Sequence, residues 1–142
     1  MKNYVNLNIF LFELPPSSTP TPSFISRLEE FIAQVKLRQR FALEYRNLKW
    51  FDDNWYHWAE SQNITSVSID SPGFPNWITN VKGLVYLMMH GRTSLYSHRY
   101  TEEELKKIAS RIKNTSPQKA YIFFNNNHDM LDNARSMKEI LM

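Results

Sequence analysis

Five strand-like segments alternate with segments of helical character along this chain, and each ends in or beside polar or charged side chains. The five segments are Ile9–Glu13, Phe41–Arg46, Ser66–Asp70, Leu84–His90 and Ala120–Asn125. Such alternation predicts a parallel α/β fold, because parallel strands need a crossover connection that is usually a helix. Ligands of parallel α/β proteins bind at the carboxyl ends of the strands. The sequence therefore predicts where a site lies, although it does not reveal a reaction.

Helical periodicity fills most of the connections between these strands. Apolar side chains recur at helical spacing from Ser23 to about Leu37, from Asp53 to Gln62, onward from Thr101, and from about Met130 to Leu141. Thr101 and Glu104 also have the spacing of a capping box. The connection that begins at Ser71 is different, because Ser-Pro-Gly-Phe-Pro favours turns and predicts a long irregular loop.

Composition narrows the class of protein. The 142 residues have a formal net charge of only +3, with basic and acidic side chains interspersed, so a nucleic acid is not the favoured partner. The chain has no cysteine, which excludes disulfides and thiolate catalysis and agrees with a cytoplasmic protein. We interpret the apolar run before Glu13 as a strand and not as a signal peptide, and we expect no membrane-spanning segment.

Two common cofactor signatures are missing. The three glycines are too few and too dispersed for a glycine-rich nucleotide loop. The four histidines do not have the spacing of a closed metal-ligand set. The sequence thus predicts no metal site and identifies no cofactor.

Three side chains at strand ends suit acid–base catalysis, namely Glu44, Asp70 and His90. Each has a structural alternative. Glu44 lies two residues before Arg46, on the same face of a strand, so a salt bridge competes with a role in substrate contact. Asp70 precedes Ser71 and Pro72, where an aspartate often caps a turn. For His90 the alternative is a hydrogen-bonded structural histidine.

Four further side chains are candidates for substrate binding. Arg46 and Arg92 have the planar guanidinium that recognises a phosphate or carboxylate, so the predicted ligand is a small anionic molecule. Asn125 and Asn126 follow the last strand, and we expect only one of them to face the pocket, because successive strand residues point in opposite directions. A surface position for Arg92 and loop hydrogen bonding for the asparagines are the alternatives.

Six motifs occur in an order and at a spacing that resemble a known family. They are Leu14-Pro15-Pro16, Glu44-Tyr45-Arg46-Asn47 followed by Trp50, Asp70-Ser71-Pro72, His90-Gly91-Arg92, Tyr100-Thr101-Glu102-Glu103-Glu104-Leu105 and Phe124-Asn125-Asn126. From about Leu11 onward the chain resembles the carboxyl-terminal portion of the YecE-like family (domain of unknown function 72). It departs from the family's pattern at Glu13, Asn47 and Met88, where glutamine, histidine and arginine are usual.

The resemblance implies an eight-stranded (β/α) barrel whose activity is not established. Residues 1–142 would then form a single partial TIM-type barrel domain of about five parallel strands, which corresponds to strands four to eight. The amino-terminal βα units would be absent, so the chain would be a truncated barrel.

A partial barrel exposes two sheet edges and an apolar inner face. We therefore expect a homodimer, or a complementary amino-terminal half, as partner. Two functions stay open at this point. The chain binds or transforms a small anionic molecule at the strand carboxyl ends, or it is an inactive relic that needs a partner.

Overall fold

The chain forms two compact units, residues 1–65 and 66–142, in a computed structural model that describes residues 7–142. Residues 1–6 lie outside the described residues, and they begin the segment that we interpreted as a strand and not as a signal peptide. The boundary between the units falls within the short strand β3 (Thr65–Ser66).

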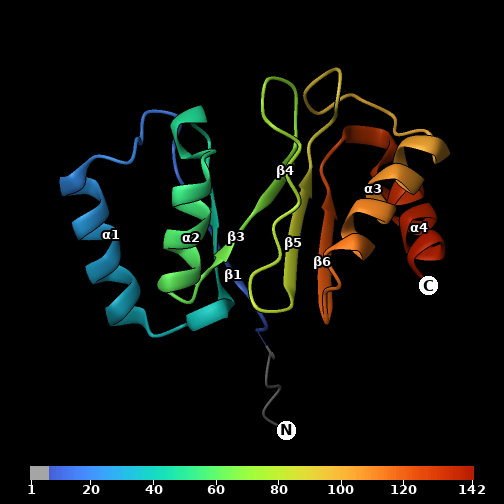
Figure 1. The fold of residues 1–142 in the computed structure, drawn as a ribbon. Helices are drawn as coiled ribbons and strands as arrows, with labels where there is room; N and C mark the ends of the chain where they lie inside the picture. Colours follow the sequence, from blue (N-terminus) through green and yellow to red (C-terminus); the bar gives the residue numbers. More distant parts are fainter. Residues whose placement is uncertain (1–6) are drawn as a thin grey trace, which may run out of the picture. The chain divides into compact units, whose positions relative to one another are not determined.

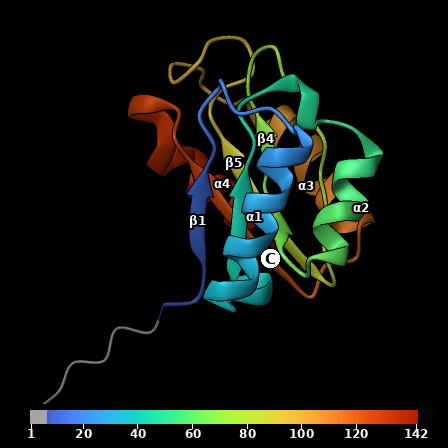
Figure 2. The ribbon, with the colours of Figure 1, turned by 90° about the vertical axis from the view of Figure 1, so that its left-hand side faces the viewer.

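A three-stranded sheet of order β1-β2-β3 organises the first unit. Strands β1 (Phe10–Glu13) and β2 (Phe41–Glu44) run parallel, and Glu13 lies opposite Glu44. Helices α1 (Pro22–Val35) and α2 (Asp53–Ser61) lie beside this sheet (Figures 1 and 2). Two 3₁₀ turns, η1 (Arg38–Arg40) and η2 (Leu48–Trp50), flank β2.

The core of the first unit explains why these segments fold as they do. Alternate residues Phe41 and Leu43 of β2 point to the helices, where they pack with Leu28 and Ile32 of α1. The indole of Trp50 is buried in the same cluster and stacks on the ring of Tyr45 at 4.9 Å. The strands therefore present their other face, which carries Ala42, Glu44 and Arg46, away from the helices.

The second unit repeats this arrangement with a sheet of order β4-β5-β6. Strands β4 (Ser68–Asp70), β5 (Leu84–Met89) and β6 (Lys119–Phe124) are parallel. Helices α3 (Glu102–Asn114) and α4 (Met130–Leu141) lie beside this sheet, and a 3₁₀ turn, η3 (Asn127–Asp129), leads into α4 (Figure 1). The core of this unit consists of side chains from β5, α3 and α4, namely Val85, Leu87, Met89, Leu105, Ile108, Ala109, Ile112 and Met137, together with Tyr100.

The segment predicted as one strand, Ser66–Asp70, contributes to two short strands, β3 and β4. β3 hydrogen-bonds to β2, whereas β4 pairs with β5, so the chain changes sheets and Val67 interrupts the ladder. The strands also end before the predicted side chains Arg46, His90 and Asn125, which lie just beyond the last paired residues. The α/β class is confirmed, and its described form is two three-stranded parallel sheets with four α-helices.

Two local predictions are confirmed. The connection between β4 and β5 contains no helix among the described residues. At the start of α3, the side chains of Thr101 and Glu104 form the predicted capping box.

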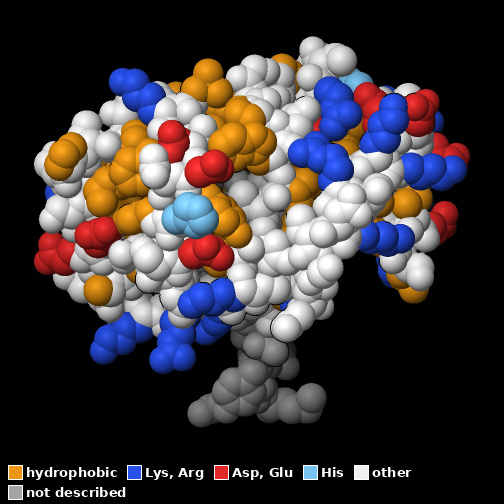
Figure 3. All heavy atoms as spheres, viewed as in Figure 1, with side chains coloured by type: hydrophobic (Ala, Val, Ile, Leu, Met, Phe, Trp, Pro, Cys, Tyr) orange, Lys and Arg blue, Asp and Glu red, His pale blue; other side chains and the backbone are white. Residues whose placement is uncertain are grey.

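The surface of α3 has paired charges. Lys106 contacts Glu102 at 2.5 Å, and Lys107 contacts Glu103 at 2.7 Å. Figure 3 shows basic and acidic side chains interspersed on this part of the surface, as expected for a solvated helix face. In residues 7–142, no helix has both the length and the apolar character that crossing a bilayer requires.

Candidate functional site

A buried carboxylate, that of Asp70, joins three segments of the second unit at the carboxyl end of β4. Its Oδ1 accepts a hydrogen bond of 2.9 Å from the hydroxyl of Tyr100. Its Oδ2 accepts one of 2.5 Å from Nη2 of Arg92. The Tyr100 oxygen in turn accepts from the backbone N–H of Gly91 at 3.0 Å. We call Asp70, Arg92 and Tyr100 the Asp70 cluster.

The pKa values of both partners of Asp70 are raised. Burial is the main reason why the pKa of Tyr100 is raised, and the negative charge and hydrogen bond of Asp70 add to it. For Arg92, burial acts to lower the pKa, but the hydrogen bond and charge of Asp70 outweigh it and the pKa is raised. Within the Asp70 cluster, the raised pKa values keep the Tyr100 phenol neutral and the Arg92 guanidinium charged.

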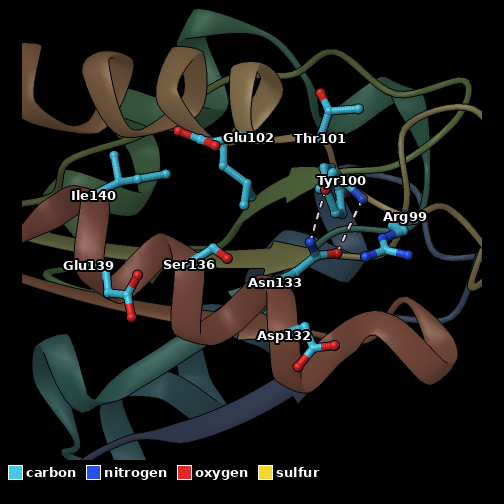
Figure 4. Close-up of a pocket in the computed structure, with 10 residues that line it drawn as sticks. Arg99, Tyr100, Thr101, Glu102, Asp132, Asn133, Ser136, Glu139 and Ile140 are labelled. Carbon is cyan, nitrogen blue, oxygen red and sulfur yellow. Dashed lines mark hydrogen bonds between the residues drawn. The ribbon is translucent and has the colours of Figure 1, made fainter.

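Helix α4 positions Tyr100 through one side chain. Oδ1 of Asn133 accepts from the backbone N–H of Tyr100 at 3.1 Å, and Nδ2 of Asn133 donates to the Tyr100 carbonyl at 2.9 Å (Figure 4). Nδ2 of Asn126 donates both to Oδ1 of Asn133 and to the carbonyl of His98, each at 2.8 Å. Asn126 is fully buried, so its amide holds the loop and the helix together.

Gly91 allows the loop after β5 to fold back on itself. Its φ is +111°, and a Cβ at this position would collide with the carbonyl oxygen of Ser94. The N–H of Tyr96 donates to the carbonyl of His90 at 2.6 Å, which closes the turn. This geometry brings Arg92 back toward Asp70.

His98 connects the same loop to the start of α3. Its Nδ1 lies 2.8 Å from Oγ1 of Thr93, and its Nε2 lies 3.1 Å from Oε2 of Glu104. Burial acts to raise the pKa of Glu104, but hydrogen bonds from the Thr101 backbone and from His98 outweigh it and lower the pKa. The capping carboxylate of α3 thus also fastens the loop that carries Arg92.

His90 and Asp70 are linked through their backbones. The N–H of His90 donates to the carbonyl of Asp70 at 2.9 Å. The register pairs Asp70 with Met89, the residue before His90. The His90 ring is 1% exposed and lies edge-on to Tyr96. The hydrogen bonds of the Asp70 carboxylate go to Tyr100 and Arg92 instead.

Two other predicted side chains, those of Glu44 and Arg46, meet in the first unit together with Glu13. Nε of Arg46 lies 2.8 Å from Oε1 of Glu44, and its Nη2 lies 2.9 Å from Oε2 of Glu13. The side chain of Glu44 is fully buried, whereas that of Glu13 is half exposed. We call these residues the Glu44 cluster. The salt bridge predicted as the alternative for Glu44 and Arg46 is therefore present.

Asn125 has a different environment from that of Asn126. Its backbone N–H donates to the carbonyl of Met89 at 2.9 Å and extends the pairing of β6, while its side chain is exposed. Within residues 7–142, no group of three His, Cys, Asp or Glu side chains is arranged to hold a metal ion.

Sequence reasoning did not select Tyr100, Asn133 or Glu13 as site residues. Tyr100 directly precedes the capping box and begins one of the six family motifs, and these two signals could have drawn attention to it. Asn133 is an interior position of α4, and its role depends on a contact 33 residues away along the chain. A pocket of about 460 Å³ next to this contact, between α3 and α4, is partly lined by Tyr100 and Asn133 (Figure 4).

The fold and these strand-end clusters define an α/β protein whose charged side chains gather at the carboxyl ends of parallel strands. The chain belongs to the family described as protein of unknown function DUF72, whose family model matches residues 5–142. The resemblance found in the motifs is thereby confirmed. No curated protein matches the chain.

Solved structures of other members of this family are similar. Two structures of a DUF72 family protein from Enterococcus faecalis V583 superpose with TM-scores of 0.84 and 0.82, at 19% and 20% identity. Both comparisons cover 94% of this chain, and they cover 58% and 60% of the other chain. A DUF72 family protein from Thermotoga maritima MSB8 gives a TM-score of 0.78 at 27% identity, over 92% of this chain and 56% of that one. The chain therefore spans less than two thirds of the length of these relatives.

Proposed function

We propose that the chain binds a small molecule through a carboxylate or phosphate group, with Arg92 as the anchoring residue. The observation that carries this proposal is the way in which Asp70 holds the guanidinium. One terminal nitrogen of Arg92 is fixed by Oδ2 of Asp70, and the side chain is 27% exposed. Its Nε is buried and has no hydrogen-bond partner in the described part of the chain. An oriented guanidinium with spare donors suits bidentate recognition of an oxyanion.

The charge balance favours Arg92 over Arg46 as the anion contact. Arg46 lies between two carboxyl groups, those of Glu13 and Glu44, which compensate its charge within the protein. Arg92 contacts the single carboxylate of Asp70. We therefore assign Arg46 the role of an internal counter-ion in the first unit.

The same contacts favour a positioning role for Asp70 over a role in proton transfer. Each of its oxygens already accepts a hydrogen bond from a protein side chain, and the carboxylate is 3% exposed. The ring of His90 is also buried, so a proton carrier at this position would require the Tyr96 turn to move. Binding is thus better supported than catalysis.

We further propose that the chain is a partial (β/α) barrel equivalent to strands four to eight of its relatives. Parallel strands joined by helices in both units, and a span of 56–60% of the related structures, support this proposal. In this view β3 and β4 together take the place of one barrel strand. The Asp70 cluster then belongs to the catalytic face of a barrel, where ligands bind.

Calorimetric and thermal titrations with inorganic phosphate and with succinate test the anion proposal, with sodium chloride used to match the ionic strength. We expect both anions to raise the melting temperature of the wild type, because a ligand that binds only the folded state stabilises it. Arg92→Gln should lose this response, and Arg92→Lys should keep part of it. Arg99→Gln is the matched control, since Arg99 is exposed and contacts Asp129 only loosely, at 3.6 Å.

Calorimetry below the melting temperature of each variant separates lost binding from lost stability. Heats of binding that are equal for the wild type and Arg92→Gln would overturn the assignment of Arg92. The absence of binding to either anion in the wild type would overturn the proposed function itself.

A further inference from the structure

We infer that copies of this chain associate by strand addition, with β6 of one copy pairing with β1 of another. In the described sheets, β6 hydrogen-bonds only to β5, and β1 only to β2. Each strand therefore has one edge whose N–H and C=O groups lack a strand partner within residues 7–142. Such edges favour pairing with another chain unless charge, proline or a covering segment blocks them.

The β6 edge has apolar surface on both faces. On the helix face, Ile122 and Phe124 line a cavity of about 260 Å³ together with Met137 and Leu141 of α4. On the opposite face, the ring of Phe123 is 45% exposed. We call this surface, with its cavity, the β6 edge.

The β1 edge, like the β6 edge, has exposed apolar side chains on both faces. Leu11, whose side chain points away from the helices, is 39% exposed. On the helix face, Phe31 of α1 is 41% exposed and contacts the ring of Phe12 edge-on at 5.6 Å. We call this surface the β1 edge.

When β6 of one copy pairs in parallel with β1 of another, the apolar side chains of the two edges lie on the same faces of the joined sheet. Such addition continues the parallel pairing within both sheets and keeps the helices of the two copies on the same side. Leu11 then packs beside Phe123, while Phe12 and Phe31 approach the cavity beside α4. The half-exposed carboxylate of Glu13 comes to the strand end that carries the exposed amide of Asn125.

These relationships favour a second copy as the occupant over a different protein. Both halves of the contact are present on one chain, and each covers apolar side chains that the other exposes. Pairing of β6 with another β6 would leave the Leu11 and Phe31 side chains uncovered. The contact is heterologous, because it joins two different surfaces of the chain. Repeated contacts therefore form a ring if the last copy meets the first, and an open assembly otherwise.

Sedimentation velocity and light scattering of the full chain over a wide range of concentration test this inference. The wild type should give masses of at least twice 16.9 kDa. Phe123→Lys places a charge in the apolar surface of the β6 edge, and Leu11→Lys does the same at the β1 edge. Each variant alone should therefore be monomeric. Leu48→Lys is the matched control, because Leu48 is a similarly exposed apolar residue outside both edges, and it should associate like the wild type.

A mixture of the two edge variants decides the arrangement. The Phe123→Lys chain keeps its β1 edge and the Leu11→Lys chain keeps its β6 edge, so the mixture should form a dimer although neither variant does so alone. Restored association also shows that both variants are folded. A wild type that stays monomeric at every concentration overturns the inference, as does a Leu11→Lys variant that associates like the wild type.

Discussion

The hydroxyl of Tyr100 connects Asp70, thirty residues earlier, to the backbone of the loop that carries Arg92. It donates to Oδ1 of Asp70 at 2.9 Å and accepts from the N–H of Gly91 at 3.0 Å. Both groups are buried, so this one oxygen provides a hydrogen-bond partner for Oδ1 of Asp70 and for the N–H of Gly91. The hydroxyl thereby fixes the start of the loop relative to the end of β4.

Tyr100→Phe should lower the free energy of unfolding by about 1–3 kcal/mol, because it leaves the Asp70 oxygen and the Gly91 N–H buried and unsatisfied. Urea denaturation measures this change. Tyr121→Phe, which alters a half-buried tyrosine of β6 outside the cluster, should change the free energy by less than about 0.5 kcal/mol. Equal effects of the two substitutions would contradict the role given to the Tyr100 hydroxyl.

Stability should fall as the pH rises above 10, the ordinary pKa of tyrosine. The pKa of Tyr100 is raised in the folded chain, so above pH 10 the unfolded chain loses this proton while the folded chain keeps it. The contribution is complete below pH 10 and is lost progressively above it. Urea denaturation across this range should show a shallower decline for Tyr100→Phe. Parallel declines for the wild type and the variant would show that other groups cause the effect.

Gly91→Ala should destabilise the chain more than Gly73→Ala. Both glycines have a positive φ, +111° and +77°, so both substitutions introduce backbone strain of about 1–3 kcal/mol. Only at Gly91 would the new methyl group also collide with a backbone atom, the carbonyl oxygen of Ser94. Thermal denaturation of the two variants isolates the cost of the collision. The loop account is wrong if the two alanine variants melt at the same temperature.

Glu44→Gln should cost about 3 kcal/mol, because it removes the buried carboxylate that compensates Arg46. Glu13→Gln removes the other carboxylate of the same cluster, but this side chain is 52% exposed, so the cost should be about 0–1 kcal/mol. Equilibrium unfolding of both variants measures the difference. A larger loss for Glu13→Gln would reverse the order of importance within the cluster.

The sequence was sufficient to predict the α/β class, the helices and the family, because these depend on local patterns. Alternation of strands and helices, the capping box of Thr101 and Glu104, and six ordered motifs are all readable without coordinates. The split of Ser66–Asp70 was not predictable, since Val67 is an ordinary strand residue. Its position between two strands depends on which neighbour each half pairs with.

The partners of the candidate site residues were predicted only where they lie close in sequence. Glu44 and Arg46 are two residues apart on a strand, and their salt bridge was one of the expected alternatives. Asp70 meets Tyr100 and Arg92 through a loop whose fold depends on Gly91 and on contacts with α4. His90, another predicted acid–base residue, hydrogen-bonds to the backbone of Asp70, whereas the Asp70 carboxylate contacts Tyr100 and Arg92.

The amide of Asn133 imitates the edge of a neighbouring strand, because it meets both the N–H and the C=O of one peptide residue as a paired backbone would. Tyr100 is thereby pinned to α4 at the point where the loop ends, and the capping box fixes the residue that follows. The loop that carries Arg92 is therefore anchored at both ends, at Gly91 by the Tyr100 hydroxyl and at Tyr100 by the amide of Asn133.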